Sequence, residues 1–149
     1  MKRVVAKVLC SLIFIISVVG YANASESFQA LSAWTNQSGS TLYIENIAKD
    51  GQVTGSYINR AQGYGCQNIA YPVTGWVYGT AIVFTVNWKS TIESCNSITA
   101  WSGFLYQGEI KTLWQLTVNG SSSTSQILKG SDTFTSGTMK SHNSLIIGK

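Results

Sequence analysis

Turn signals recur at short intervals along this chain, and they constrain its fold more than any other feature. Between Ser32 and Phe134 they separate runs of β-branched and aromatic residues. The turn sequences are Gln37-Ser38-Gly39, Asp50-Gly51, Tyr78-Gly79, Gln107-Gly108 and Asn119-Gly120-Ser121. Short strands joined by such turns are typical of antiparallel sheets. The chain has one proline and no 3.6-residue apolar period, so we expect little helix.

The runs between these turns predict eight strands. Their expected positions are residues 32–37, 40–47, 52–58, 72–78, 80–88, 97–106, 109–118 and 125–135. Eight antiparallel strands can close on themselves, which removes the exposed edges that favour aggregation. We therefore predict an all-β fold, an eight-stranded antiparallel up-and-down β-barrel. A two-layer sandwich is the alternative, because counting strands does not separate the two architectures.

Residues 1–24 have the pattern of a secretory signal peptide. Basic residues begin the chain, an apolar run follows from Val8 to Gly20, and Ala22-Asn23-Ala24 forms a cleavage site. The apolar run is shorter than the ~20 residues that cross a bilayer, which disfavours a transmembrane helix. Cleavage after Ala24 would leave one domain, residues 25–135, and a tail, residues 136–149, that we expect to be flexible. We expect a secreted or periplasmic protein with no membrane partner.

The charge of the chain excludes one class of partner. The formal net charge is +4, but Lys2, Arg3 and Lys7 belong to the predicted leader. The remaining chain is close to neutral and carries no basic stripe, so we expect no nucleic-acid binding.

The cysteines predict one disulfide. Cys10 lies in the leader, which leaves Cys66 and Cys95 in the exported chain. In an oxidising compartment these two are expected to pair, and two free buried thiols are the alternative. Cys66 lies in the longest connection, Asn59–Tyr71, which is rich in glycine and polar residues. We interpret this connection as a lid over one end of the barrel.

Polar residues occupy alternate positions that share a strand face. Trp34 shares a face with Asn36, Tyr57 with Asn59, and Ser97 with Thr99 and Trp101. A polar group buried without a partner costs about 1–3 kcal/mol. If these faces point inward, we expect a polar ligand or water to satisfy them; the alternative is that they face solvent.

Tryptophans strengthen the case for a pocket. The chain has five, and Trp88, Trp101 and Trp114 fall on three successive predicted strands, where they can converge. Aromatic walls with a few fixed polar groups describe a small-molecule site. A tryptophan-rich core is the alternative.

Catalytic and metal chemistry find little support. The single histidine, His142, lies in the predicted tail, so no nucleophilic triad can be built on the strands. No cluster of metal ligands is apparent from sequence spacing. Asp132 in the last predicted strand could face inward or outward. We interpret the other acidic residues as solvated charges: Glu26, Glu45, Asp50, Glu93 and Glu109.

Several segments together resemble a known family. They are WTNQSGS (34–40), GQVTGSY (51–57), YPVTGW (71–76), GTAIVFTVNW (79–88), SITAWSG (97–103), TLWQLT (112–117) and LKGSDTF (128–134). In this order, and over nearly the whole exported chain, they resemble the avidin and streptavidin family of biotin-binding proteins. The NRAQGYGCQN loop and the ESCNS segment resemble the short dimeric members of that family.

The resemblance implies a function and a set of roles. It implies a non-catalytic barrel that sequesters biotin as its ligand and needs no cofactor or metal. Asn36, Ser40 and Tyr57 would donate to the ureido oxygen, while Asn59 and Asp132 would accept from the ureido N–H groups. Thr99 would lie near the ring sulfur and Ser97 near the valeryl carboxylate. The aromatic walls would be Trp88, Trp101 and Trp114.

The sequence departs from the tetrameric members at one position. In those members a tryptophan about eight residues before the aspartate enters a neighbour's pocket, whereas residues 121–128 read SSSTSQIL here. We therefore expect a homodimer. Competing functional hypotheses are a lipocalin-like barrel for another small apolar metabolite, an exported hydrolase, and an adhesion domain without a pocket.

Overall fold

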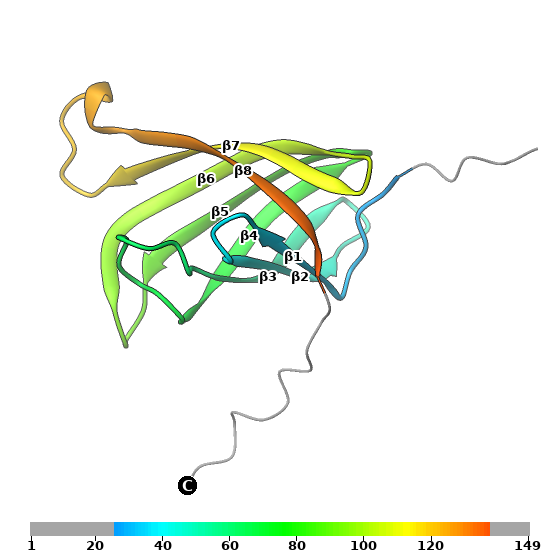
Figure 1. The fold of residues 1–149 in the computed structure, drawn as a ribbon, viewed down its shortest axis with the longest axis horizontal. Coiled ribbons are helices and arrows are strands. Elements are labelled where there is room, and N and C mark those ends of the chain that lie inside the picture. Colours follow the sequence, from blue (N-terminus) through cyan, green and yellow to red (C-terminus); the bar gives the residue numbers. More distant parts are fainter. Residues whose placement is uncertain (1–25, 138–149) are drawn as a thin grey trace, which may run out of the picture.

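Eight antiparallel strands form a closed barrel in the computed structural model, which describes residues 26–137 (Figure 1). The strands are β1 (Ser32–Asn36), β2 (Thr41–Ile47), β3 (Gln52–Ile58), β4 (Ala70–Tyr78), β5 (Ala81–Lys89), β6 (Ser94–Tyr106), β7 (Glu109–Val118) and β8 (Leu128–Gly137). Each strand pairs with the next, and β1 pairs with β8, where Asn36 lies opposite Phe134. The predicted barrel is confirmed, and the sandwich is excluded by this closing pair.

Strand boundaries differ from the prediction at a few ends. The segment expected to begin the last strand at residue 125 instead forms a 3₁₀ turn, η1 (Thr124–Gln126), whose capping box joins Ser123 and Gln126. Strand β8 therefore begins at Leu128 and runs to Gly137. Strands β4 and β6 begin earlier than expected, at Ala70 and Ser94.

Turn chemistry decides where the barrel reverses direction beside the site. Gly39, between β1 and β2, has φ 81°, in the left-handed region that glycine adopts without a steric penalty. The Gly39 N–H donates to the carbonyl of Asn36, and the N–H of Asn36 donates to the carbonyl of Ser40. This tight turn places Asn36 and Ser40 side by side at one end of the barrel.

The barrel interior is apolar over much of its length. Phe84, Phe134 and Ile110 are fully buried, and Phe84 stacks on Trp101 with ring centroids 4.8 Å apart. Residues ahead of β1 pack against the end where the β6–β7 turn lies, since Glu26 accepts a hydrogen bond from the N–H of Gly108. The opposite end carries buried polar side chains. Among the described residues, no helix has the length and apolar character needed to cross a membrane.

Candidate functional site

A cavity of about 400 Å³ opens at the end of the barrel that carries the β1–β2, β3–β4, β5–β6 and β7–β8 connections. This volume is typical of small-molecule sites. Every residue that we predicted for the pocket lines it: Asn36, Ser40, Tyr57, Asn59, Trp88, Ser97, Thr99, Trp101, Trp114 and Asp132. Among the described residues that line the cavity, Asp132 is the one with a charged side chain.

The β1–β2 turn sets the orientation of the Asn36 amide. Its Oδ1 accepts from the backbone N–H groups of Ser38 at 3.0 Å and Ser40 at 2.9 Å. With the oxygen occupied by the turn, the Nδ2 group is directed toward the hydroxyl of Tyr57 at 3.4 Å. Asn36 therefore presents a donor to the cavity.

Asn59 has the opposite polarity. Its Nδ2 donates to the carbonyl of Gly65 at 2.9 Å, while its Oδ1 accepts from the N–H of Ala61 at 3.0 Å. The same oxygen accepts from the Ser40 hydroxyl at 3.3 Å. An amide oxygen has two lone pairs, so a ligand that replaces the Ser40 hydroxyl finds an acceptor at Asn59.

Ser40 and Tyr57 supply hydroxyl groups between these two amides. Ser40 is buried, and its Oγ accepts from the N–H of Arg60 at 2.8 Å, which leaves its proton as a donor. Burial raises the pKa of Tyr57 well above its ordinary value, and the negative charge of Asp132 raises it further. The Tyr57 hydroxyl therefore stays protonated and able to donate at neutral pH.

These buried polar groups partner one another, which corrects the expectation that burial alone would require a ligand. Among the described residues, every deeply buried side-chain nitrogen or oxygen has a hydrogen-bond partner. Two of the partnerships in the cavity are long, Asn36 to Tyr57 at 3.4 Å and Ser40 to Asn59 at 3.3 Å. Hydrogen bonds of this length are weak, so a ligand can replace them at low cost.

Asp132 faces inward and is held by two donors. The indole Nε1 of Trp101 donates to Oδ2 at 2.9 Å, and Nε2 of Gln37 donates to Oδ1 at 2.8 Å. Gln37 also bonds the β8 backbone, donating to the carbonyl of Ser131 and accepting from the N–H of Thr133. Sequence reasoning missed Gln37, because the Gln37-Ser38-Gly39 segment reads as a turn and its partner lies on the last strand.

Aromatic side chains converge along the walls of the cavity. The rings of Tyr57 and Trp101 lie 5.0 Å apart, and those of Trp88 and Trp101 lie 6.5 Å apart at an interplanar angle of 63°. The Nε1 of Trp88 donates to the hydroxyl of Thr99 at 2.7 Å. These contacts leave the tryptophans with fixed orientations.

Trp114 depends on a glycine that the sequence did not single out. It lies opposite Trp101 on β6 and opposite Gly130 on β8. A Cβ atom at Gly130 would come within 2.4 Å of the Trp114 ring. The missing side chain therefore gives the indole its space against β8.

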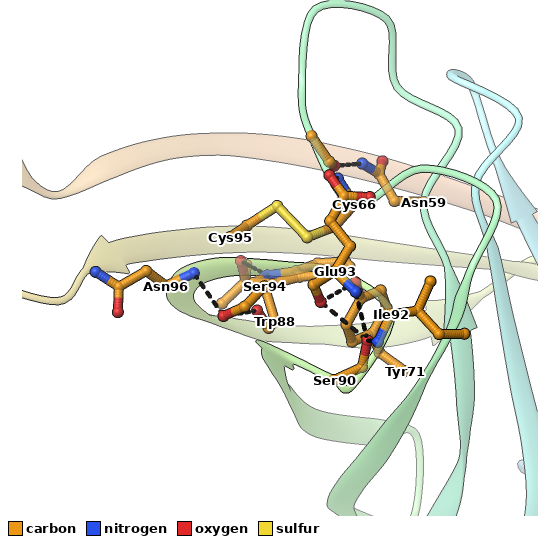
Figure 2. The surroundings of a disulfide bond; sticks show 12 residues. Asn59, Cys66, Tyr71, Trp88, Ser90, Ile92, Glu93, Ser94, Cys95 and Asn96 are labelled. Atoms are coloured by element: carbon orange, nitrogen blue, oxygen red, sulfur yellow. Dashed lines mark hydrogen bonds between the residues drawn. A yellow bond between two sulfur atoms is a disulfide. The ribbon is translucent and has the colours of Figure 1, made fainter.

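The predicted disulfide is confirmed, and it joins the β3–β4 connection to the start of β6 (Figure 2). Cys66 belongs to the lid loop, residues 59–69 between β3 and β4, and Cys95 is the second residue of β6. The lid loop also brings Tyr64, another residue that sequence reasoning missed, into the cavity lining.

The interpretation of Glu93 as a solvated charge is incomplete. Glu93 is exposed, as expected of a solvated charge, but its Oε1 also accepts from the N–H of Cys66 at 3.0 Å. The carboxylate of Glu93 also lies within 4.8 Å of both cysteine sulfurs, a grouping that sequence spacing did not reveal. Because the sulfurs are joined in a disulfide, they are not available as thiolate ligands.

Comparison with known proteins places this geometry in a family. Residues 24–137 match the avidin family over most of the chain. The chain belongs to the avidin family. Afifavidin from Afifella pfennigii is 44% identical over 108 residues, which cover 70% of this chain and 67% of that protein. Hoefavidin from Hoeflea phototrophica is 39% identical over 114 residues, 69% of each chain.

Solved structures of avidins agree with this assignment. Apo shwanavidin is 61% identical, with a TM-score of 0.74 over 76% of this chain and 100% of that chain. The rhizavidin–biotin complex is 45% identical, with a TM-score of 0.68 over 76% of this chain and 99% of the other. The fold predicted from the resemblance is thereby confirmed.

Proposed function

We propose that this avidin binds biotin non-covalently, without transforming it, in the open end of its barrel. The observation that carries the proposal is the polarity of the cavity floor. Three donors, Asn36 Nδ2 and the hydroxyls of Ser40 and Tyr57, lie beside two acceptors, Asn59 Oδ1 and the Asp132 carboxylate. A cyclic urea has the complementary pattern, one carbonyl oxygen flanked by two N–H groups.

Binding would exchange weak internal hydrogen bonds for stronger ones. The Ser40 hydroxyl would turn from Asn59 to the ureido oxygen, and Asn59 Oδ1 would accept a ureido N–H in its place. The protonated Tyr57 and the amide of Asn36 would complete three donors around one oxygen, an arrangement that favours an oxygen with partial negative charge. Asp132 would accept the second N–H in a charge-assisted bond.

The rest of the ligand would meet aromatic walls. Trp88, Trp101 and Trp114 would cover the apolar ring system, with Thr99 near the sulfur and Ser97 toward the carboxylate. Support comes from the rhizavidin structure, which is a biotin complex, and from a biotin complex of a shwanavidin mutant. The polar floor disfavours the alternative of a lipocalin-like carrier for an apolar metabolite.

The disulfide would hold the lid loop ready for the ligand. Loop ordering on binding costs free energy, so a loop fixed beforehand raises affinity. We infer that this preorganisation partly replaces the tryptophan that is absent from residues 121–128. The disulfide and the predicted leader also support an oxidising location, the periplasm or the medium.

Tryptophan fluorescence of the oxidised protein, titrated with biotin, tests the proposal. We expect quenching or a blue shift that saturates near one ligand per chain, and weaker binding of desthiobiotin. Asn36→Ala should weaken binding, whereas Asn119→Ala, in an exposed turn, should not. A flat titration on folded protein freed of co-purified biotin would contradict the proposal.

A homodimer is the assembly that the outer surface supports. Trp76, Val83 and Leu113 are exposed on the outside of β4, β5 and β7, and they lie in one cross-strand row with Ser102. A second copy that packs here would bury this apolar row. Sedimentation should show a dimer that Leu113→Glu dissociates, while Thr54→Glu on the outside of β3 leaves it intact. A wild-type monomer at micromolar concentration would refute it.

A further inference from the structure

The lid loop is joined twice to the β5–β6 hairpin, once covalently and once through a hydrogen bond. The disulfide connects Cys66 in the lid loop to Cys95 at the start of β6. Beside it, Oε1 of Glu93 accepts the backbone N–H of Cys66 at 3.0 Å (Figure 2). Glu93 belongs to the connection between β5 and β6, two residues before Cys95, so this bond links the lid loop to the same β5–β6 hairpin as the disulfide.

The backbone of Glu93 is held in place by hydrogen bonds within and beside the β5–β6 connection. Its carbonyl accepts from the hydroxyl of Tyr71, which is fully buried on β4, at 2.9 Å. The same carbonyl accepts from the N–H and the hydroxyl of Ser90, and the Ser90 hydroxyl accepts from the N–H of Glu93. The side chain of Glu93 thus reaches the lid loop from a fixed base.

The backbone of the lid loop at Cys66 is strained and needs interactions that hold it in place. Cys66 has φ 55°, in the left-handed region that residues other than glycine adopt at a cost. The preceding residue, Gly65, packs so closely that a Cβ atom there would lie 2.9 Å from the Cys95 sulfur and 3.6 Å from Oε1 of Glu93. The Gly65–Cys66 segment is therefore held against the β5–β6 connection.

This segment reaches the cavity through Asn59. The Gly65 carbonyl accepts from Nδ2 of Asn59 at 2.9 Å, and this bond acts together with the Ala61 N–H on Oδ1 to set which end of the amide faces the cavity. If Gly65 moves away, Nδ2 of Asn59 loses its partner, the bonds to Oδ1 alone hold the amide, and the amide turns over more easily. The acceptor at Asn59 would then become a donor and would repel a ligand N–H.

We propose that Glu93 is a positioning residue for ligand binding. Its carboxylate is a non-covalent latch that acts in parallel with the disulfide and, through Gly65, keeps Asn59 Oδ1 turned toward the ligand. This inference rests on the proposed biotin function for its effect on affinity. The latch itself, the Glu93 carboxylate on the Cys66 N–H, is a property of the lid loop in the free protein.

Two links in parallel predict a dependence on redox state. With the disulfide intact, loss of the latch changes little, because the covalent link keeps the lid loop in place. With the disulfide broken, the Glu93 carboxylate provides the remaining side-chain hydrogen bond from the β5–β6 connection to the Cys66 backbone within the described part of the chain. Removal of the Glu93 carboxylate should then speed ligand dissociation more than it does in the oxidised protein.

The experiment compares biotin dissociation from the wild type, Glu93→Ala and Glu93→Gln, each with and without Cys66→Ser plus Cys95→Ser. In the oxidised protein we expect Glu93→Ala to speed biotin dissociation less than about threefold. Without the disulfide we expect the same substitution to speed dissociation about tenfold, because that factor corresponds to the loss of one hydrogen bond to a charged group. Glu93→Gln keeps an acceptor oxygen for the Cys66 N–H, so its biotin dissociation rate should stay close to that of the protein with Glu93. Glu109→Ala, a charge removal in the β6–β7 region, is the matched control.

Hydrogen exchange of the lid loop separates the latch from the biotin function. Amide exchange around Cys66 should accelerate in Glu93→Ala without the disulfide, and Glu93→Gln should reverse this. If biotin does not bind the wild type but exchange follows this pattern, the proposed function fails and the latch stands. Equal dissociation and equal exchange for wild type and Glu93→Ala in the disulfide-free background would overturn the latch.

Discussion

The side-chain amide of Gln37 donates a 2.8 Å hydrogen bond to the carboxylate of Asp132, although 95 positions separate the two residues. The amide is itself fixed by the backbone of β8, through Ser131 and Thr133. Together with Trp101, Gln37 holds both carboxylate oxygens in place. The acceptor in the cavity is therefore oriented before any ligand arrives.

Loss of Gln37 should weaken biotin binding through Asp132. Gln37→Ala removes one donor to the carboxylate, and we expect about 1 kcal/mol lower affinity, a factor of roughly five to ten in Kd. Calorimetry by competition with desthiobiotin measures this. Gln115→Ala, on the outside of β7, is the control. If the effects of Gln37→Ala and Asp132→Ala simply add, Gln37 does not act through Asp132.

A methyl group at position 130 should displace Trp114. Because the Cβ of Gly130→Ala would lie 2.4 Å from the indole, the ring must move. We expect a stability loss of about 1–3 kcal/mol from overpacking, and weaker biotin binding as one wall of the cavity shifts. Chemical denaturation and fluorescence titration report the two effects, with Lys129→Ala as the control. Wild-type affinity in this variant would show that Trp114 does not contact the ligand.

The raised pKa of Tyr57 predicts that the protein loses stability at alkaline pH. Burial raises its pKa above the ordinary value of 10.0, so above pH 10 the unfolded chain releases this proton while the folded protein keeps it. The unfolded state then binds fewer protons, and the free energy of unfolding falls as pH rises. Below pH 10 this residue contributes no slope. Unfolding measured at pH 8 and pH 11 should show a smaller alkaline loss in Tyr57→Phe than in wild type; equal losses would contradict the assignment.

Removal of the disulfide should affect both stability and binding. Cys66 and Cys95 are separated by 29 positions, and opening a loop of this size costs about 3–4 kcal/mol in the chain-entropy description. Cys66→Ser plus Cys95→Ser should lower the free energy of unfolding by that amount and speed biotin dissociation. An unchanged dissociation rate would show that the disulfide does not prepare the lid loop for ligand.

Local sequence patterns predicted where the strands lie and which pocket residues share a strand face. Alternation placed Ser97, Thr99 and Trp101 on one face, and all three line the cavity. The start of β8 was harder, because Thr124–Gln126 forms a 3₁₀ turn where the residues resemble a strand. Gln37, Glu93 and Gly130 were missed as site residues because each acts through a partner that is distant in the chain.

The sequence by itself determined the all-β class, the turns, which polar and aromatic positions share a strand face, and the pairing expected of the two cysteines in an oxidised chain. These features depend on the local dihedral preferences of glycine, on the two-residue period of strands, and on cysteine count. The tertiary structure alone decided that β1 closes on β8, which brings Asn36 and Gln37 to Asp132. It also decided which end of each amide faces the cavity, because that orientation is set by hydrogen bonds that exist after the barrel has closed and the lid loop has been tied down.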